Sequence, residues 1–195
     1  MGIFAFLATP IWVNLLLLVP LATWIYFRKN KLSINRDILL KTGVFGIAFG
    51  FIEAACIIYL RAATGLLPGF QGTLSDVQKQ SIGIYNQLLL QQRLPISLLT
   101  VEIIREIGTM VMIISIAFVT TKYLKERIAM FLWVFAFWDI FYYVFLYLTV
   151  RWPEGLRTQD VLFLIPQPWF GEVWMPILIS STVIISIFLN TKKNN

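Results

Sequence analysis

Residues 96–121 read ISLLTVEIIREIGTMVMIISIAFVTT, and this stretch decides the class of fold. Its 26 residues are almost wholly apolar, and the charged exceptions are Glu102, Arg105 and Glu106. At about 1.5 Å per residue, a helix of this length reaches about 39 Å, which exceeds the roughly 30 Å hydrocarbon core of a bilayer. We therefore predict a membrane-spanning helix that carries charged groups inside the bilayer.

Four more apolar stretches, at residues 3–27, 42–60, 128–150 and 173–189, approach the length that a bilayer requires. The whole chain is 58% hydrophobic and only 13% charged, against roughly 25% charged residues in soluble domains. We predict one integral membrane domain over residues 1–195, an all-α polytopic transmembrane helix bundle of about five spans. Pro10 and Pro20 are expected to bend or break the first span, because proline removes a backbone donor.

The formal net charge of +6 indicates orientation and not nucleic-acid binding, since the basic residues lie at the ends of the apolar stretches. Most of them fall in two connections and the C-terminal tail: Arg28, Lys29, Lys31, Arg36, Lys41, Lys122, Lys125, Arg127, Lys192 and Lys193. The positive-inside rule then places the N-terminus outside and the C-terminus in the cytoplasm, in the plasma membrane.

Two connections on the predicted outer side have features of their own. Ser75 and Gln78 have capping-box spacing, and apolar residues recur at helical spacing as far as Pro95, which predicts an amphipathic interfacial helix. In the second connection, Asp160 precedes residues 161–165, VLFLI, and the Pro/Trp-rich PQPW of residues 166–169. Five apolar residues are too few to span, so we expect a short loop in the outer leaflet, or an aromatic belt.

Acidic residues inside the predicted spans are the main indication of a functional site, because an ionised carboxylate in lipid costs at least about 2.5–3.5 kcal/mol. They lie in the outer half or the middle of three spans, at similar depths. The candidate ion- or substrate-binding residues are Glu53, Arg61, Glu102, Arg105, Glu106, Asp139, Tyr142, Tyr143 and Asp160. We expect these side chains to turn inward around one polar cavity.

Pairing within this group is predicted from spacing. Glu102, Arg105 and Glu106 lie on one helix face, so the two glutamates are expected to share a proton, a cation or the arginine. Asp139 has no basic residue within four positions, and its cation is expected from Arg105 or Arg61 on another helix.

A close helix contact is expected at Gly46 and Gly50, whose small-xxx-small spacing lets backbones approach each other. This face could serve the bundle itself or oligomerisation.

The chemistry that the residues allow is limited. The chain has no histidine, which excludes His-ligated haem, His-containing zinc or di-iron sites and Ser-His or Cys-His nucleophiles. Its single cysteine, Cys56, lies in an apolar stretch and forms no intrachain disulfide. No cofactor is predicted, although Glu53, Glu102, Glu106 and Asp139 are oxygen ligands that suit a divalent cation such as Mg²⁺ or Ca²⁺.

Several segments together carry a resemblance to known sequences. They are residues 53–61, 102–106, 138–143 and 162–166, which read EAACIIYLR, EIIRE, WDIFYY and LFLIP. Over about residues 53–180 the chain resembles a group of uncharacterised small multi-pass bacterial membrane proteins. The resemblance implies one integral membrane unit and brings no activity, cofactor or catalytic residue.

Three functions fit these observations. The leading interpretation is binding or transport of a proton, a cation or a small cationic substrate. The second is a membrane enzyme that uses Glu53, Glu102, Glu106 or Asp139 as acid and base on a lipid or isoprenoid. The third is a structural subunit in which a buried ionic network sets helix register. Partners are expected to be the lipid bilayer and a small ion or lipid-like substrate.

Overall fold

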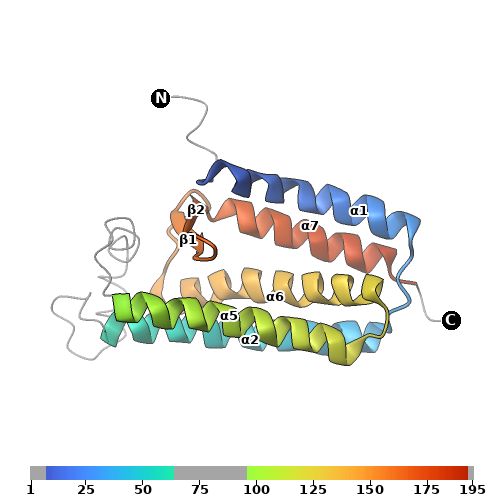
Figure 1. Ribbon diagram of the computed structural model, residues 1–195, viewed down its shortest axis with the longest axis horizontal. Helices are drawn as coiled ribbons and strands as arrows, with labels where there is room; N and C mark the ends of the chain where they lie inside the picture. Colours follow the sequence, from blue (N-terminus) through green and yellow to red (C-terminus); the bar gives the residue numbers. More distant parts are fainter. Residues whose placement is uncertain (1–7, 64–95, 193–195) are drawn as a thin grey trace.

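The computed structural model describes residues 8–63 and 96–192, and this part of the chain is mostly helical (Figure 1). The elements are the 3-10 helix η2 (Ile11–Leu18), α1 (Val19–Lys29), α2 (Arg36–Ala63), α5 (Ile96–Thr120), α6 (Leu124–Val150), β1 (Gln159–Phe163), β2 (Trp169–Glu172) and α7 (Trp174–Asn190). Within the described residues, four helices are long and apolar enough to cross a membrane: Ile11–Lys29, Arg36–Tyr59, Leu99–Thr120 and Leu124–Val150. These helices indicate a membrane protein. The predicted fifth span corresponds to α7, which is shorter, with 17 residues.

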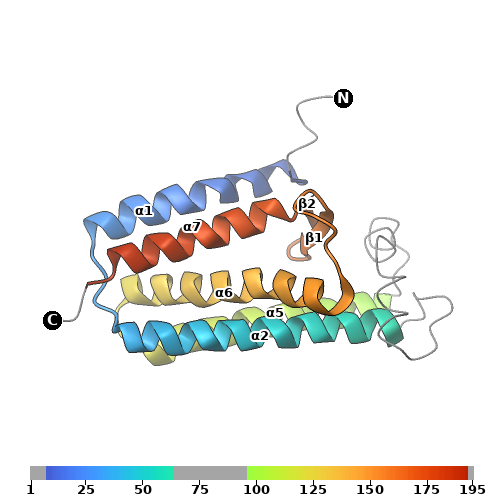
Figure 2. The same ribbon diagram turned by 180° about the vertical axis from the view of Figure 1, so that it is seen from behind.

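The long helices lie lengthwise beside one another, and α6 is the centre of the arrangement (Figures 1 and 2). It packs against α2, α5 and α7, while α1 packs on the far side of α7. Met130, Val134 and Leu146 of α6 are fully buried in contacts with these neighbours. The indole N–H of Trp133 donates to the carbonyl oxygen of Leu39 over 2.9 Å, which ties α6 to α2. A helix that is apolar all round and packed on several sides belongs in the interior of a bundle.

The first helix of the described residues begins at Ile11, and residues 3–7 of the predicted first span lie outside the described part of the chain. Thr9 is extended and exchanges two backbone hydrogen bonds of 2.7 Å with Phe170 of β2. Helical structure starts at Ile11, directly after Pro10, and changes from 3-10 to α geometry at Val19, beside Pro20. The expected break is therefore a change of helix type, since Pro20 has no N–H to donate to the preceding turn.

Gly46 and Gly50 let α2 approach α6 of the same chain. A Cβ atom on Gly46 would lie 2.8 Å from the Cβ of Phe137, and one on Gly50 would lie 2.9 Å from the carbonyl oxygen of Trp138. These distances are too short for any side chain larger than hydrogen. The small-residue face at Gly46 and Gly50 is thus occupied by α6 of the same chain.

The second connection on the predicted outer side, where we expected a short outer-leaflet loop or an aromatic belt, forms a β-hairpin. β1 and β2 pair antiparallel, with Asp160 opposite Gly171 and an irregular register between Val161 and Phe163. Pro166 and Pro168 fall between the strands, where the missing N–H groups interrupt no ladder. The apolar residues 161–165 are too few to distinguish a strand from a helix by sequence pattern alone. The strand β1 is defined by its pairing with residues 169–172.

The opposite end of the bundle gathers the basic connections. Leu32 pairs with Thr191, the Lys31 ammonium donates to the side chain of Asn190 over 3.0 Å, and the Lys125 ammonium donates to the carbonyl oxygen of Lys31 over 2.8 Å. Figure 1 shows the C-terminal end of α7 at this end and the hairpin at the other. The amphipathic helix predicted to begin at Ser75 lies outside the described residues.

Candidate functional site

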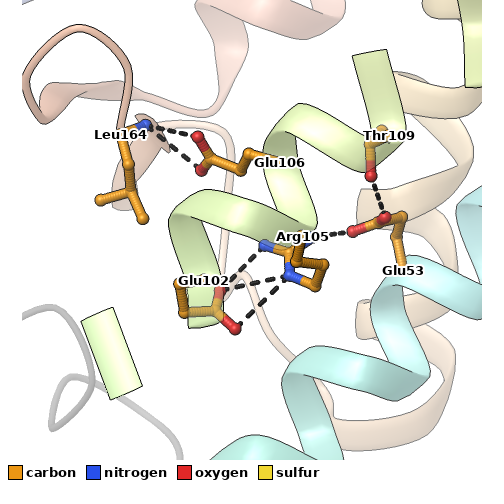
Figure 3. A network of polar contacts seen from close by, with 6 residues as sticks. All are labelled: Glu53, Glu102, Arg105, Glu106, Thr109 and Leu164. Atoms are coloured by element: carbon orange, nitrogen blue, oxygen red, sulfur yellow. Dashed lines mark hydrogen bonds and ion pairs between the residues drawn. The ribbon is translucent and has the colours of Figure 1, made fainter. Parts of the chain in front are cut away.

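Arg105 on α5 joins two carboxylates from different helices (Figure 3). Its Nη2 atom lies 2.9 Å from Oε2 of Glu102, one turn earlier on α5, while its Nη1 atom donates to Oε2 of Glu53 on α2. The side chain of Glu53 is 5% exposed and that of Glu102 is 4% exposed, against 21% for Arg105. The guanidinium therefore pairs with two carboxylates that are almost fully buried.

Thr109 completes the partners of Glu53. Its hydroxyl donates to Oε1 of Glu53, the oxygen that Arg105 does not use. Residues 102, 105 and 109 recur at helical spacing and so lie on one face of α5, which is the face that meets α2. Arg105 and Thr109 of this face both reach Glu53 of α2.

Glu106 turns away from Arg105, toward the hairpin. Both oxygens of its carboxylate accept the backbone N–H of Leu164, at 3.0 and 3.2 Å (Figure 3). Leu164 directly follows β1, so the hairpin is tied to α5 by a backbone donor. Glu102 and Glu106 thus accept hydrogen bonds from different donors, and the sharing of one proton or one cation by the two glutamates stays a prediction.

Asp139 lies in the middle of α6 and is held by a neutral donor. The hydroxyl of Ser180 on α7 donates to its Oδ2 atom over 2.7 Å. The prediction of an ion pair with Arg105 is wrong, because Arg105 is engaged by Glu53 and Glu102. The side chain of Arg61, the other predicted partner, lies outside the described side chains.

A second neutral contact joins α6 to the hairpin. The hydroxyl of Tyr143 donates to Oδ2 of Asp160 on β1 over 2.9 Å, and both residues are buried. Asp160 therefore belongs to the same end of the bundle as Asp139, one turn of α6 from Tyr143.

These side chains surround one space of about 50 Å³, which we call the polar cavity. Every sequence candidate whose side chain the structure describes lines it: Glu53, Glu102, Arg105, Glu106, Asp139, Tyr142, Tyr143 and Asp160. Ile57, Thr109, Trp138 and residues 161–164 complete the lining among the described residues. A water molecule needs about 10–15 Å³ measured in this way, so the cavity has room for a few waters or a small ion and not for an organic molecule.

Sequence reasoning missed three donors of this site. Thr109 could have been found, since it continues the helical spacing of Glu102 and Arg105. Ser180 and the N–H of Leu164 gave no such signal, because they are brought to Asp139 and Glu106 only by the fold.

Metal ligation has little support in the described part of the chain. No three carboxylates or other metal-ligating side chains there converge closely enough to hold a metal ion.

Comparison of the chain with protein-family models, curated proteins and solved structures gives no match.

Proposed function

We propose that this protein binds a proton or a small inorganic cation in the polar cavity, as part of cation transport across the membrane. The observation that supports this most is the kind of hydrogen-bond donor that Glu106 and Asp139 each have. Both are buried within the helix bundle, and among the described residues both accept hydrogen bonds only from neutral donors. An acidic group in that position is neutral only when it carries a proton or has a cation beside it.

Charge balance gives the physical reason. Arg105 is the only basic side chain among the described residues that line the polar cavity, and it is already engaged by Glu53 and Glu102. A lone ionised carboxylate in a medium of low polarity has an effective penalty of several kcal/mol. Glu106 and Asp139 therefore favour uptake of a positive charge from solution.

The volume of the polar cavity limits the size of the substrate that it can bind. A volume of about 50 Å³ holds a few waters or a dehydrated ion. This favours a proton or an inorganic cation over the small organic cation that the sequence left open.

The topology that fits this function has five spans. α7 is 17 residues long, or about 25 Å, which is near the lower limit for crossing a bilayer, and it lies beside α1 and α6. The basic connections gather at one end of the bundle and the polar cavity at the other. By the positive-inside rule, the basic end faces the cytoplasm, the N-terminus lies outside the plasma membrane, and the cavity lies toward the outer face.

Transport is tested with the purified full-length protein in liposomes. Uptake of protons, Na⁺ and K⁺ is measured after a gradient is imposed, with a trapped pH indicator or with radioactive cations. The wild type should exceed protein-free liposomes for one of these ions. Glu106→Gln and Asp139→Asn should lose most of that uptake while remaining folded.

Glu126→Gln is the matched control, since Glu126 is also a buried carboxylate of α6 but does not line the polar cavity. It should keep the uptake of the wild type. No uptake of any of the three ions above protein-free liposomes would contradict the proposal, as would equal uptake by Glu106→Gln and the wild type.

A further inference from the structure

A second, larger cavity lies beside the polar one. Its volume is about 270 Å³, and we call it the apolar cavity because nearly all of its lining is hydrocarbon. It lies between η2, α5, α6, α7 and the hairpin, and its lining includes Leu16, Met110, Phe135, Ile179 and Val183. Most of the lining residues are half-buried, so the cavity reaches the surface of the bundle, where lipid chains surround a membrane protein.

Polar groups gather where the two cavities meet. Trp138 and Asp139 line both cavities, and Ser180 and Trp169 line the apolar one. The indole Nε1 atoms of Trp138 and Trp169 are buried, and no described residue forms a hydrogen bond with either of them. A buried donor left unpaired costs roughly 1–3 kcal/mol. Two such donors beside one apolar cavity call for a ligand that carries an acceptor.

We propose that the apolar cavity binds the hydrocarbon chain of a single-chain lipid whose polar end is an uncharged hydroxyl group. The volume is sufficient, since an engineered apolar cavity of about 150 Å³ already holds a benzene molecule. A hydroxyl is both donor and acceptor. It accepts from the indole N–H of Trp138 and donates to the free carboxylate oxygen of Asp139, which satisfies both groups at the junction of the cavities.

Electrostatics selects the hydroxyl over a phosphate. Asp139 and Glu106 are acidic and line the adjoining cavity, and Arg105 is engaged by two other carboxylates. A phosphate at the junction would place further negative charge beside them, where the low polarity of the surroundings increases repulsion. This inference stands on the apolar cavity and does not depend on cation transport.

The inference is tested by photolabelling the purified full-length protein in detergent. The probe is a long-chain primary alcohol with a diazirine in its chain, and labelled peptides are identified by mass spectrometry. Labels are expected on lining residues such as Met110, Phe135 and Ile179. A phosphate ester of the same chain should label them at least about tenfold less.

Two variants separate the apolar cavity from general contact with lipid. Ile179→Trp fills the cavity and should lower labelling at least about tenfold. Leu178→Trp, the neighbouring residue that is 48% exposed, should leave labelling unchanged. Trp138→Phe keeps the ring and removes the N–H, so the affinity for the alcohol should fall about fivefold, the loss of one hydrogen bond.

The outcomes that overturn the inference are specific. Equal labelling by the alcohol and its phosphate ester would refute the hydroxyl, and equal labelling of Ile179→Trp and wild type would refute the cavity. If Ile179→Trp fails to fold, the affinity of Trp138→Phe decides, and an affinity equal to that of the wild type refutes the proposal. Cation uptake in liposomes is scored separately, so either proposal can fail alone.

Discussion

Arg105→Met should destabilise the protein more than any other single change at the polar cavity. Arg105 pairs with Glu53 of α2 and Glu102 of α5, so its removal takes the cationic partner from Glu53 and one charged partner from Glu102. Breaking a buried ion pair by removing one partner typically costs 3–5 kcal/mol. For a chain of this size, that corresponds to a loss of about 6–20 °C in melting temperature.

The partners of Arg105 allow a double-mutant cycle. Glu53→Gln alone leaves Arg105 paired with Glu102, so it should cost about 1.5–3 kcal/mol, the range for a charged hydrogen bond. The double variant Arg105→Met with Glu53→Gln should be more stable than the sum of the single losses predicts, since the glutamine is neutral.

The assay is unfolding of the purified variants in one detergent, by heat and by denaturant. Arg28→Met removes an exposed arginine of α1 and should change stability by less than about 0.5 kcal/mol. Strictly additive losses in the cycle, or an Arg105→Met variant as stable as Arg28→Met, would refute the ionic link between α2 and α5.

Three further predictions concern packing, pairing and topology. Gly50→Ala should cost about 1–3 kcal/mol in detergent unfolding, because its Cβ would meet backbone atoms of α6 at 2.9 Å, whereas Gly108→Ala has open space and should be neutral or stabilising; equal effects would contradict the α2–α6 contact. Asp139→Asn should change stability by less than about 1 kcal/mol, since the amide oxygen still accepts the hydroxyl of Ser180, and a loss of several kcal/mol would mean that Asp139 has a cationic partner. A reporter fused to the C-terminus should be active only in the cytoplasm, and activity on the outer side would reverse the proposed orientation.

Much of the site was predictable from the spacing of charges inside apolar stretches. The i, i+3, i+4 spacing of Glu102, Arg105 and Glu106 alone places them on one helix face. Charged side chains inside a membrane are expected to face a shared polar space. Their meeting in one cavity with Glu53 and Asp139 follows from the cost of exposing any of them to lipid.

The choice of partners was not predictable, because it depends on contacts between distant segments. Ser180 is 41 residues from Asp139, and the N–H of Leu164 is 58 residues from Glu106. The hairpin was missed for the same reason, since residues 159–163 become a strand by pairing with β2. A search for charged partners alone overlooks neutral donors, and these hold two of the carboxylates.

The most direct test of the proposed cation site is to measure whether the carboxyl groups of Glu106 and Asp139 carry a proton or a bound cation. Infrared difference spectra of the protein in liposomes report protonated carboxyl groups and their response to added Na⁺ or K⁺. We predict a protonated-carboxyl band, or a carboxylate band shifted by one of these cations, that is lost in Glu106→Gln or Asp139→Asn and kept in Glu126→Gln. A spectrum with no such band, unchanged by cations and by all three substitutions, would contradict the assignment of a cation site to the polar cavity.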